Sequence, residues 1–531
     1  MNPNAQQQAV IDATESQIFV VAGPGSGKTA TLVERIKKDS ETIETGEMVI
    51  ITFTNAGANE LKKRLGMIEP GYIGTLHGYC FRMLRKYGEA LGYRNGISIF
   101  PEDSKEALLV QVADFLSIKA SKKKLMENPP DAVKSEYLFR LKSENMVDFD
   151  GILTEALRLL KGWVQYPFPA LYVDEAQDSG PVDWAIYEAL QARQKIFIGD
   201  FDQSIYGFRG AVPHEFMDRA DKNGFWKLET NYRSDIEICK AGNQIIELCK
   251  KRIQKKIVPN SEKRGKLSLS NFDQDTDEMK TIASRLLTEP MESAVLLRTN
   301  SLVRQFRDML GLLGVPVKSD PYSSLPVGFN AARALLACWM NRYSNISARR
   351  FLEAMKVPSD LLNKRSLECQ IAGKPLSSIP EFPQHYWEAN VPAALTLLAM
   401  AKIPAETIAV IGSRIKEIKS DSLTELSVDL ASHEDWAESK GGSDGVEVLT
   451  IHKAKGREWD RVFLPAWESD VIPMSSGEIE EEIRLAFVAI TRARHELFIT
   501  SSFNRKTQWG RKNATPSPFY NELLKDMKDL A

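Results

Sequence analysis

Short uninterrupted apolar runs, rather than alternating ones, mark the first half of the chain. Polar residues or glycine bound four of them: Ile18–Val21, Met48–Ile51, Leu171–Val173 and Ile196–Ile198. Because a parallel strand is covered on both faces, it reads as a continuous β-branched run. Apolar positions with helical spacing lie between the runs, so the pattern predicts an α/β unit with a parallel sheet.

A second set of similar runs predicts a second α/β unit: Ala294–Leu297, Val446–Leu449, Val462–Leu464 and Leu497–Ile499. Two other stretches are helical in pattern and interrupted by proline, so we expect each to be an insertion. The predicted layout is a first unit over 1–89 and 146–225 with an insertion over 90–145, and a second unit over 226–325 and 441–531 with a reduced insertion over 326–440. The glycine- and serine-rich stretch 438–445 is predicted to be a flexible connector that returns to the second sheet.

Composition narrows the class of protein. The 531 residues are 43% hydrophobic, which excludes a disordered or fibrous chain. Lys and Arg total 69 against 71 Asp and Glu, so a nucleic-acid partner would need a local basic channel. The cysteines form no Cys-x-x-Cys pair, and no leader or clean membrane span is read, so we expect a cytoplasmic protein. The basic runs at 122–124 and 250–256 favour solvated helix faces, with nucleic-acid contact left open.

A glycine-rich segment follows the first predicted strand and precedes a helical pattern. It reads Ala22-Gly23-Pro24-Gly25-Ser26-Gly27-Lys28-Thr29, with alanine where the strict pattern has glycine. Its backbone N–H groups and the helix N-terminus would cradle phosphates. Lys28 would reach the β- and γ-phosphates, and the Thr29 hydroxyl would hold Mg²⁺.

Acidic and aromatic residues follow two further strands. Asp174 and Glu175 follow the Leu171–Val173 strand. Phosphoryl transfer needs one carboxylate near Mg²⁺, the role expected of Asp174, and one to activate water, the role expected of Glu175. The segment Gly199–Gly210 contains Gln203, placed to sense a γ-phosphate. It also contains the aromatic residues Tyr206 and Phe208, whose faces suit stacking on bases.

Together these segments resemble the UvrD/Rep/PcrA-type DNA helicases of superfamily 1, subfamily A. Further family motifs follow in order along the chain and cover both units but not the insertions: Gln6-x-x-Ala9-Val10, Thr52–Glu60, Gly74–His77, Val147–Phe149, Glu229–Ser234, Leu297–Asn300, Thr450–Glu458 and Glu481–Ala493. The resemblance implies two RecA-like domains, each with a helical insertion, and ATP and Mg²⁺ between them.

The resemblance also implies roles for single residues. Gln6 would read adenine, Tyr232 would stack on it, and Glu458 would bind the ribose. Arg233 and Arg492 would reach the γ-phosphate from the second unit, as arginine fingers do. The residues implied in contact with single-stranded DNA are Phe53, Asn55, His77, Tyr206, Phe208, Arg209, Thr450 and His452.

The implied activity is ATP-driven 3′→5′ movement on single-stranded DNA and unwinding of tailed duplexes, with a nuclease or a repair or replication protein as a further partner. Ala30 stands where the family often has arginine beside the base, so adenine preference rests on Gln6 and Tyr232. The insertions are short, and a Gly-Gly-aromatic-Arg pattern is missing between Val317 and Ala331. Two alternatives remain open: a DNA-sensing ATPase subunit that regulates a partner nuclease, and a P-loop switch independent of nucleic acid.

Overall fold

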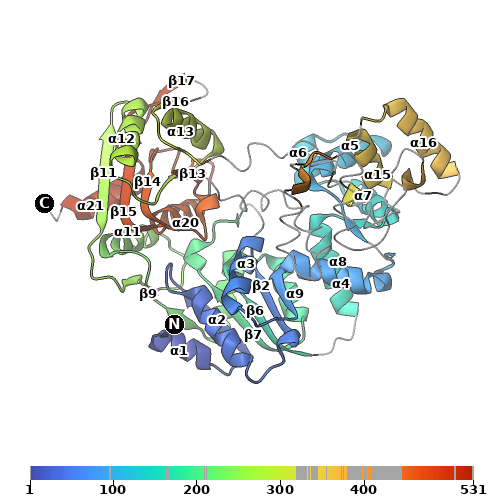
Figure 1. Ribbon diagram of the computed structural model, residues 1–531, viewed down its shortest axis with the longest axis horizontal. Helices are drawn as coiled ribbons and strands as arrows, with labels where there is room; N and C mark the ends of the chain where they lie inside the picture. Colours follow the sequence, from blue (N-terminus) through green and yellow to red (C-terminus); the bar gives the residue numbers. More distant parts are fainter. Residues whose placement is uncertain are drawn as a thin grey trace.

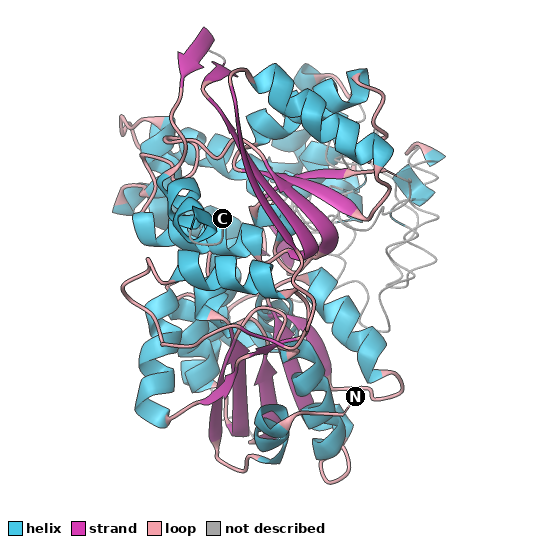
Figure 2. Ribbon diagram, turned by 90° about the vertical axis from the view of Figure 1, so that its left-hand side faces the viewer, coloured by secondary structure: helices cyan, strands magenta, loops and turns pink. Residues whose placement is uncertain are grey.

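The computed structural model describes residues 2–94, 97–162, 167–207, 210, 212–318, 345–354, 356–371, 376–379, 445–507 and 510–528, with isolated positions between 332 and 411. Two parallel sheets lie one above the other in the molecule, each flanked by helices (Figure 2). The predicted α/β class with two parallel-sheet units is therefore confirmed.

The first sheet has six strands in the order β3-β2-β6-β7-β1-β8. All its pairings are parallel. Its strands are β1 (Gln17–Ala22), β2 (Met48–Thr52), β3 (Tyr72–Thr75), β6 (Phe168–Val173), β7 (Ala192–Gly199) and β8 (Trp226–Leu228). The last of these joins the first sheet although it lies beyond residue 225, where we expected this unit to end.

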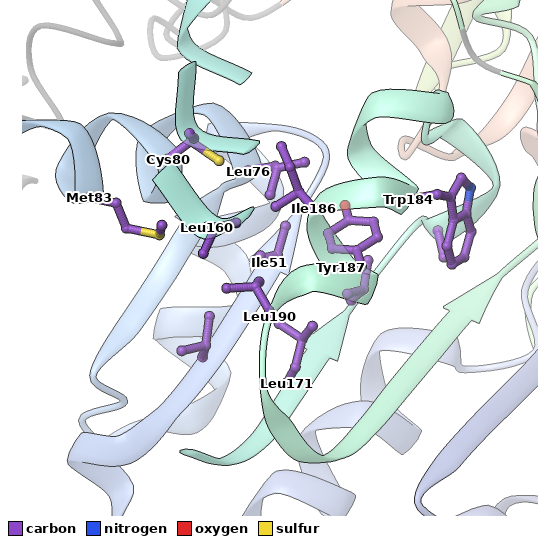
Figure 3. Packing of buried hydrophobic residues seen from close by; sticks show 14 of the residues in the cluster. Ile51, Leu76, Cys80, Met83, Leu160, Leu171, Trp184, Ile186, Tyr187 and Leu190 are labelled. Carbon is purple, nitrogen blue, oxygen red and sulfur yellow. The ribbon is translucent and has the colours of Figure 1, made fainter. Parts of the chain in front are cut away.

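Helices cover both faces of this sheet (Figure 1). They are α1 (Ala5–Asp12), α2 (Lys28–Asp39), α3 (Asn55–Leu65), α4 (Leu76–Tyr87), α8 (Phe149–Gly162), α9 (Pro181–Ala189) and α10 (Pro213–Asn223). Alternate strand residues face opposite cores because side chains alternate along a strand. Ile51 and Leu171 pack against Leu160 and Leu190 on the side of α4, α8 and α9 (Figure 3).

The second sheet has five strands in the order β11-β15-β14-β12-β13, again all parallel. They are β11 (Lys266–Phe272), β12 (Ser293–Leu297), β13 (Glu447–Thr450), β14 (Trp459–Leu464) and β15 (Ala493–Ser502). Its helices are α11 (Ile236–Ile246), α12 (Asp275–Thr288), α13 (Asn300–Leu312), α20 (Ile479–Ile490) and α21 (Pro518–Lys528). The short pair β9 (Thr230–Asn231) and β10 (Val258–Pro259) flanks α11, and a hairpin follows β15: β16 (Asn504–Thr507) and β17 (Gly510–Asn513).

The segment between α4 and α8 forms a small helical body of its own. It contains β4 (Ser98–Ile99), α5 (Lys105–Phe115), α6 (Lys122–Glu127), α7 (Asp131–Ser143) and β5 (Met146–Val147). Because β4 pairs with β5, the chain leaves and re-enters the first unit at one place. Of the region 326–440, the described α-helices are α15 (Asn345–Ala354) and α16 (Ser359–Ile371), which lie beside this body in Figure 1. The predicted connector lies outside the described residues, apart from Gly445.

The two basic runs differ. Lys122 and Lys123 are exposed on α6 and pair with Glu106 and Glu127, as expected of a solvated helix face. The second run is not a helix, and its Arg252 and Lys255 side chains are buried. The expectation of a solvated helix face was wrong for this second run. Asp200 and Asp202 of the first unit are buried carboxylates that require positive partners.

We expect the core of the first unit to be sensitive to truncation of Phe19. Its buried ring stacks on Phe197 with centroids 5.1 Å apart and also contacts Trp184. Phe19→Ala should lower the free energy of unfolding by about 3–5 kcal/mol in urea denaturation followed by tryptophan fluorescence. The control Met67→Ala, at a 97% exposed side chain, should change it by less than about 0.5 kcal/mol. Equal effects of the two substitutions would contradict the assigned packing.

Candidate nucleotide and nucleic-acid site

Three neighbouring strands of the first sheet end at one edge, and each is followed by a predicted motif. The order β6-β7-β1 is parallel, so the carboxyl ends of these strands lie together. The glycine-rich loop follows β1, Asp174 and Glu175 follow β6, and the segment with Gln203 follows β7. Ligands of open parallel sheets bind at this edge.

The glycine-rich loop has the backbone that a phosphate cradle requires. Gly25 and Gly27 have φ of 63° and 77°, in the left-handed region that glycine adopts without strain. Gly27 is the N-cap of α2, so the helix N-terminus with Lys28 and Thr29 opens toward the cradle. Ser26 donates from Oγ to the carbonyl of Gly23 at 2.8 Å, which closes the turn. Ala22 is the buried last residue of β1.

The two carboxylates after β6 differ in their surroundings. Burial, reinforced by the charge of Glu175, raises the pKa of Asp174 to about 7, and Thr29 hydrogen-bonds to it. Burial acts to raise the pKa of Glu175 as well, but the charges of Lys28 and Lys455 outweigh burial and lower it. Gln177 Nε2 donates to Glu175 Oε2 at 2.6 Å. The site therefore keeps Glu175 ionised, as a base requires.

The Thr29 hydroxyl and the Asp174 carboxylate are hard oxygen donors in contact with each other. Mg²⁺ prefers such ligands and usually completes its shell with water and substrate phosphates, so these residues fit the predicted ion. Bound there, Mg²⁺ would neutralise charge on the phosphate oxygens.

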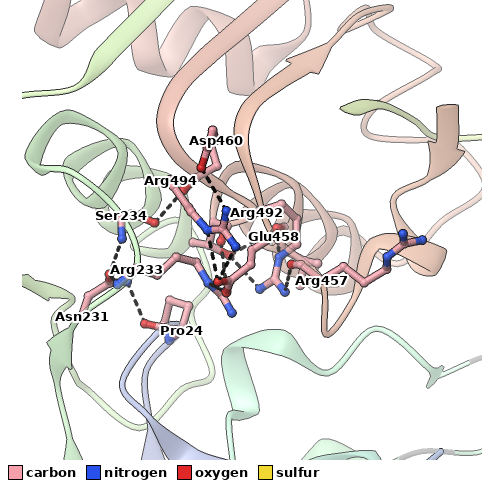
Figure 4. Close-up of polar contacts among 12 residues, drawn as sticks. Pro24, Asn231, Arg233, Ser234, Arg457, Glu458, Asp460, Arg492 and Arg494 are labelled. Carbon is pink, nitrogen blue, oxygen red and sulfur yellow. Dashed lines mark hydrogen bonds and ion pairs between the residues drawn. The ribbon is translucent and has the colours of Figure 1, made fainter. Parts of the chain in front are cut away.

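Residues of the second unit approach the loop closely. A Cβ atom added at Gly25 would lie 2.7 Å from the Cβ of Arg233. Asn231 joins the two parts: its Nδ2 donates to the Pro24 carbonyl at 2.7 Å, and its Oδ1 accepts from the backbone N–H of Arg233 and Ser234 at 2.8 and 2.7 Å. Figure 4 shows Arg233, Glu458, Arg492 and Arg494 gathered above Pro24.

Arg492 is a buried cation with neutral hydrogen-bond partners. Its Nη2 donates to Gln203 Oε1 at 2.9 Å, and Nε and Nη1 donate to the carbonyls of Val488 and Arg457 at 3.0 and 3.1 Å. Burial, together with the nearby charge of Arg233, lowers the pKa of Arg492 to about 9. A positive charge held this way favours an anionic ligand, and the first unit supplies the amide that orients it.

Glu458 lies between two arginines. It forms ion pairs with Arg233 and, at 3.1 Å, with Arg494. Burial acts to raise the pKa of Glu458, but the charge of Arg233 and the hydrogen bond from Arg494 outweigh it and lower the pKa. The carboxylate thus holds Arg233 beside the loop.

The predicted base-reading residues lie at one side of the loop. Gln6 Oε1 accepts the backbone N–H of Glu229 at 3.1 Å. The ring of Tyr232 is 44% exposed, and its hydroxyl accepts from Asn4 at 2.8 Å. An exposed ring held at its hydroxyl offers one face to a flat base.

Two predicted stacking residues meet in the structure. The rings of Phe53 and Tyr206 are stacked with centroids 4.9 Å apart and an interplanar angle of 23°. The Tyr206 hydroxyl donates to the carbonyl of His452 at 3.4 Å, and Lys455 Nζ lies 4.9 Å from the Tyr206 centroid. Because His452 and Lys455 come from the second unit, this aromatic pair lies where both units meet.

The other predicted nucleic-acid contacts are more dispersed. His77 stacks on Phe149 with centroids 4.1 Å apart, and burial lowers its pKa to about 4, so it brings no positive charge at neutral pH. Asn55 begins α3, and Thr450 is the buried end of β13. Phe208 and Arg209 lie outside the described residues.

Some residues of the site were missed by sequence reasoning. Gln7 is buried and donates to the carbonyl of Ser26 at 3.0 Å, beside the Gln6 that we singled out. Asn231 and Lys455 lie inside recognised motifs, but no role was assigned to them. Lys455 forms an ion pair with Asp178, and both side chains are buried. The sequence signal for this pair was Asp178, a further carboxylate four residues after Asp174 to which no role was assigned.

Comparison of the sequence with known protein families agrees with this geometry in both units. The family described as the UvrD/REP helicase N-terminal domain matches residues 3–128 and 119–223, and the UvrD-like helicase C-terminal domain matches 226–369 and 408–504. The chain belongs to the UvrD/REP helicase family. It is therefore an ATP-hydrolysing enzyme, and the resemblance that the motifs indicated is confirmed.

Relatives of this family match the chain along nearly its whole length. It is similar to the ATP-dependent DNA helicase PcrA of Leuconostoc citreum, with 26% identity over 99% of this chain and 85% of the relative. The probable DNA helicase II homolog of Rickettsia conorii is 25% identical over 98% of this chain and 95% of its own length. The PcrA of Bacillus subtilis is 25% identical over 99% and 86%.

The first of these alignments spans 642 positions, against 531 residues in this chain, so the relative carries additional residues inside the matched region. Among the residues that the structure describes, no helix is both long and apolar enough to cross a membrane.

The contacts of Asn231 predict a specific loss. Asn231→Ala removes the acceptor for two backbone N–H groups and the donor to Pro24, and buried groups left without partners cost about 1–3 kcal/mol each. We expect affinity for a non-hydrolysable ATP analogue to fall by about tenfold or more in a fluorescence titration. Asn223→Ala, at an exposed asparagine of α10, is the control and should bind as the parent does. Unchanged affinity of a folded Asn231→Ala variant would contradict this role.

Proposed function

We propose that the protein is an ATP-dependent DNA helicase that moves 3′→5′ on single-stranded DNA and opens tailed duplexes. ATP with Mg²⁺ would bind between the two units, and closure of the units on ATP would be coupled to movement of the strand. One observation carries the proposal: Gln203 of the first unit and Arg492 of the second are hydrogen-bonded at 2.9 Å beside the phosphate cradle. Hydrolysis thus requires both units.

The residues of this chain supply the following chemistry. Lys28 binds the terminal phosphates, and ionised Glu175 accepts the proton of the attacking water. Arg233 and Arg492 stabilise the charge that develops on the transferred phosphoryl group, an effect worth roughly 10³–10⁵ in rate for arginine fingers. Gln203 orients Arg492 and senses the γ-phosphate. Loss of that phosphate removes an anion from between the units and lets them separate.

A continuous set of contacts supports coupling between DNA and this chemistry. A base that enters between Phe53 and Tyr206 changes the environment of Lys455, which lies over the Tyr206 ring and pairs with Asp178. Gln177 donates to both Asp178 and Glu175, at 3.2 and 2.6 Å. Stacking of a base is worth about 1–3 kcal/mol, enough to shift the balance of these contacts. DNA binding would thereby stimulate ATP hydrolysis.

The first test concerns Glu175, the proposed proton acceptor. Glu175→Gln keeps the shape of the side chain and removes the proton acceptor, so DNA-stimulated ATP hydrolysis should fall by about 10²-fold or more. Affinity for ATP should stay within about threefold of the parent, because Lys28 and the loop are unchanged. A radiometric assay with and without single-stranded DNA measures the rate of ATP hydrolysis, and an equilibrium titration measures the affinity for ATP. Hydrolysis retained in this variant would remove Glu175 from the mechanism.

The second test concerns direction. Duplexes with a 3′ or a 5′ single-stranded tail are mixed with the protein, ATP and Mg²⁺, and strand separation is followed by gel or fluorescence. We expect the 3′-tailed duplex to open at least about tenfold faster, because movement along the tail carries the protein into the duplex. Preferential opening of the 5′-tailed duplex would contradict the direction. DNA-stimulated hydrolysis without opening of either substrate would instead support an ATPase subunit that senses DNA.

A further inference from the structure

A buried, charge-balanced cluster lies behind Gln203, on the side away from Arg492. Asp200 and Asp202 come from the segment after β7, and Arg252 and Lys255 from the segment between α11 and β10. Lys255 Nζ lies 2.8 Å from Asp200 Oδ1 and 2.7 Å from Asp202 Oδ2, and Arg252 Nη2 lies 2.8 Å from Asp202 Oδ2. Two positive charges thus meet two negative charges away from water.

Lys255 occupies a position that the local pattern gives to an apolar residue. Ile253 and Ile257 on either side are buried, and Gln254 and Lys256 between them are exposed. Lys255 therefore points inward in an extended segment, and its side chain is only 2% exposed. A buried ammonium group is strongly unfavourable unless it is paired, so a lysine here requires the two carboxylates in front of it.

Asp200 connects this lysine to the proposed catalytic groups. One of its carboxylate oxygens accepts from Lys255, and the other accepts from Gln203 Nε2. The opposite end of the Gln203 amide, Oε1, accepts from Arg492. The backbone N–H of Asp200 donates to Gln177 Oε1 at 2.8 Å, and Gln177 Nε2 donates to Glu175.

We infer that Lys255 is a positioning residue: by holding Asp200, it fixes which end of the Gln203 amide faces Arg492 and so sets the arginine for phosphoryl transfer. The inference rests on the proposed function. An amide can turn end for end, and an acceptor that takes a hydrogen bond from Nε2, here the Asp200 carboxylate, favours the orientation that keeps Oε1 toward the cation. Without its lysine, Asp200 loses the charge that holds it in this geometry.

The place of Lys255 in the fold adds a link between the units. Its segment leads from α11 into β10, which pairs with β9. Tyr232 and Arg233 follow β9 directly, so Lys255 is carried by the same part of the chain as two of the residues proposed to bind ATP. A movement of α11 relative to the first unit would pull on Asp200 and on Arg233 together.

The test compares Lys255→Met with Lys256→Met, a neutralisation at the exposed neighbouring lysine. The ATP turnover number at saturating ATP, the KM for ATP and the affinity for a non-hydrolysable analogue are measured for each, with and without single-stranded DNA. We expect Lys255→Met to lower the turnover number by about tenfold or more and to leave analogue affinity within about threefold. Lys256→Met should match the parent in all of them.

A double variant separates positioning from general damage. Because Lys255 acts through Gln203, Lys255→Met should add little to Gln203→Ala, and the double variant should turn over ATP within about twofold of Gln203→Ala alone. If the double variant instead loses the product of the two single-variant reductions in turnover number, the inference is wrong. A folded Lys255→Met protein with the turnover number of the parent would also overturn it.

A third variant keeps the test sharp if Lys255→Met does not fold. Lys255→Met combined with Asp202→Asn removes one charge of each sign, so the net charge of the cluster stays at zero, and the new amide oxygen at position 202 can still accept from Arg252. This variant should melt closer to the parent temperature than Lys255→Met alone and still show the reduced turnover number. Parent turnover in this variant, or failure of both variants to fold, would assign the cluster to stability alone. A parent protein that hydrolyses ATP but opens no duplex would count against the proposed helicase function and leave the ratios between variants readable.

Discussion

The architecture depends on one requirement: positive charge must be kept buried at the junction of two sheets until an anion arrives. Arg492 meets this requirement with carbonyl and amide oxygens rather than with a carboxylate partner, and its lowered pKa records the cost of that arrangement. A cation solvated by dipoles can turn to a phosphate without first giving up a carboxylate partner. The carboxylates nearby are correspondingly engaged elsewhere, Glu458 with Arg233 and Asp178 with Lys455.

Much of this fold was readable from the sequence because burial on both faces leaves a strong pattern. The eight apolar runs all became strands, since a parallel strand covered by helices tolerates few polar residues. Strands β3, β8 and β11 escaped notice for related reasons. The first two are short, and β11 is an edge strand whose residues are half-buried or exposed, so its apolar residues alternate with polar ones.

The site was predictable where backbone or charge alone defines a function, and less so where a side chain supports another. The glycine loop, the paired carboxylates and the arginines follow from local patterns, and the structure brings them to one edge. Asn231 and Lys255 act through partners distant in sequence, and nothing local distinguishes an asparagine that holds a loop from one in a turn. Lys255 was misread for the same reason: a run of lysines indicates a surface until the two aspartates that it faces are known.

Gly25 illustrates how far the two halves of the molecule depend on each other. Its positive φ accounts for glycine in the phosphate loop, but the space beside it is already filled by the first side-chain carbon of Arg233. Even a residue that tolerated the backbone angle would act as a wedge between the halves. A phosphate loop taken from an unrelated nucleotide-binding protein would therefore need glycine at the position of Gly25. The phosphate loop and the segment that carries Arg233 can therefore be exchanged only together, because the space beside Gly25 holds one side-chain carbon and no more.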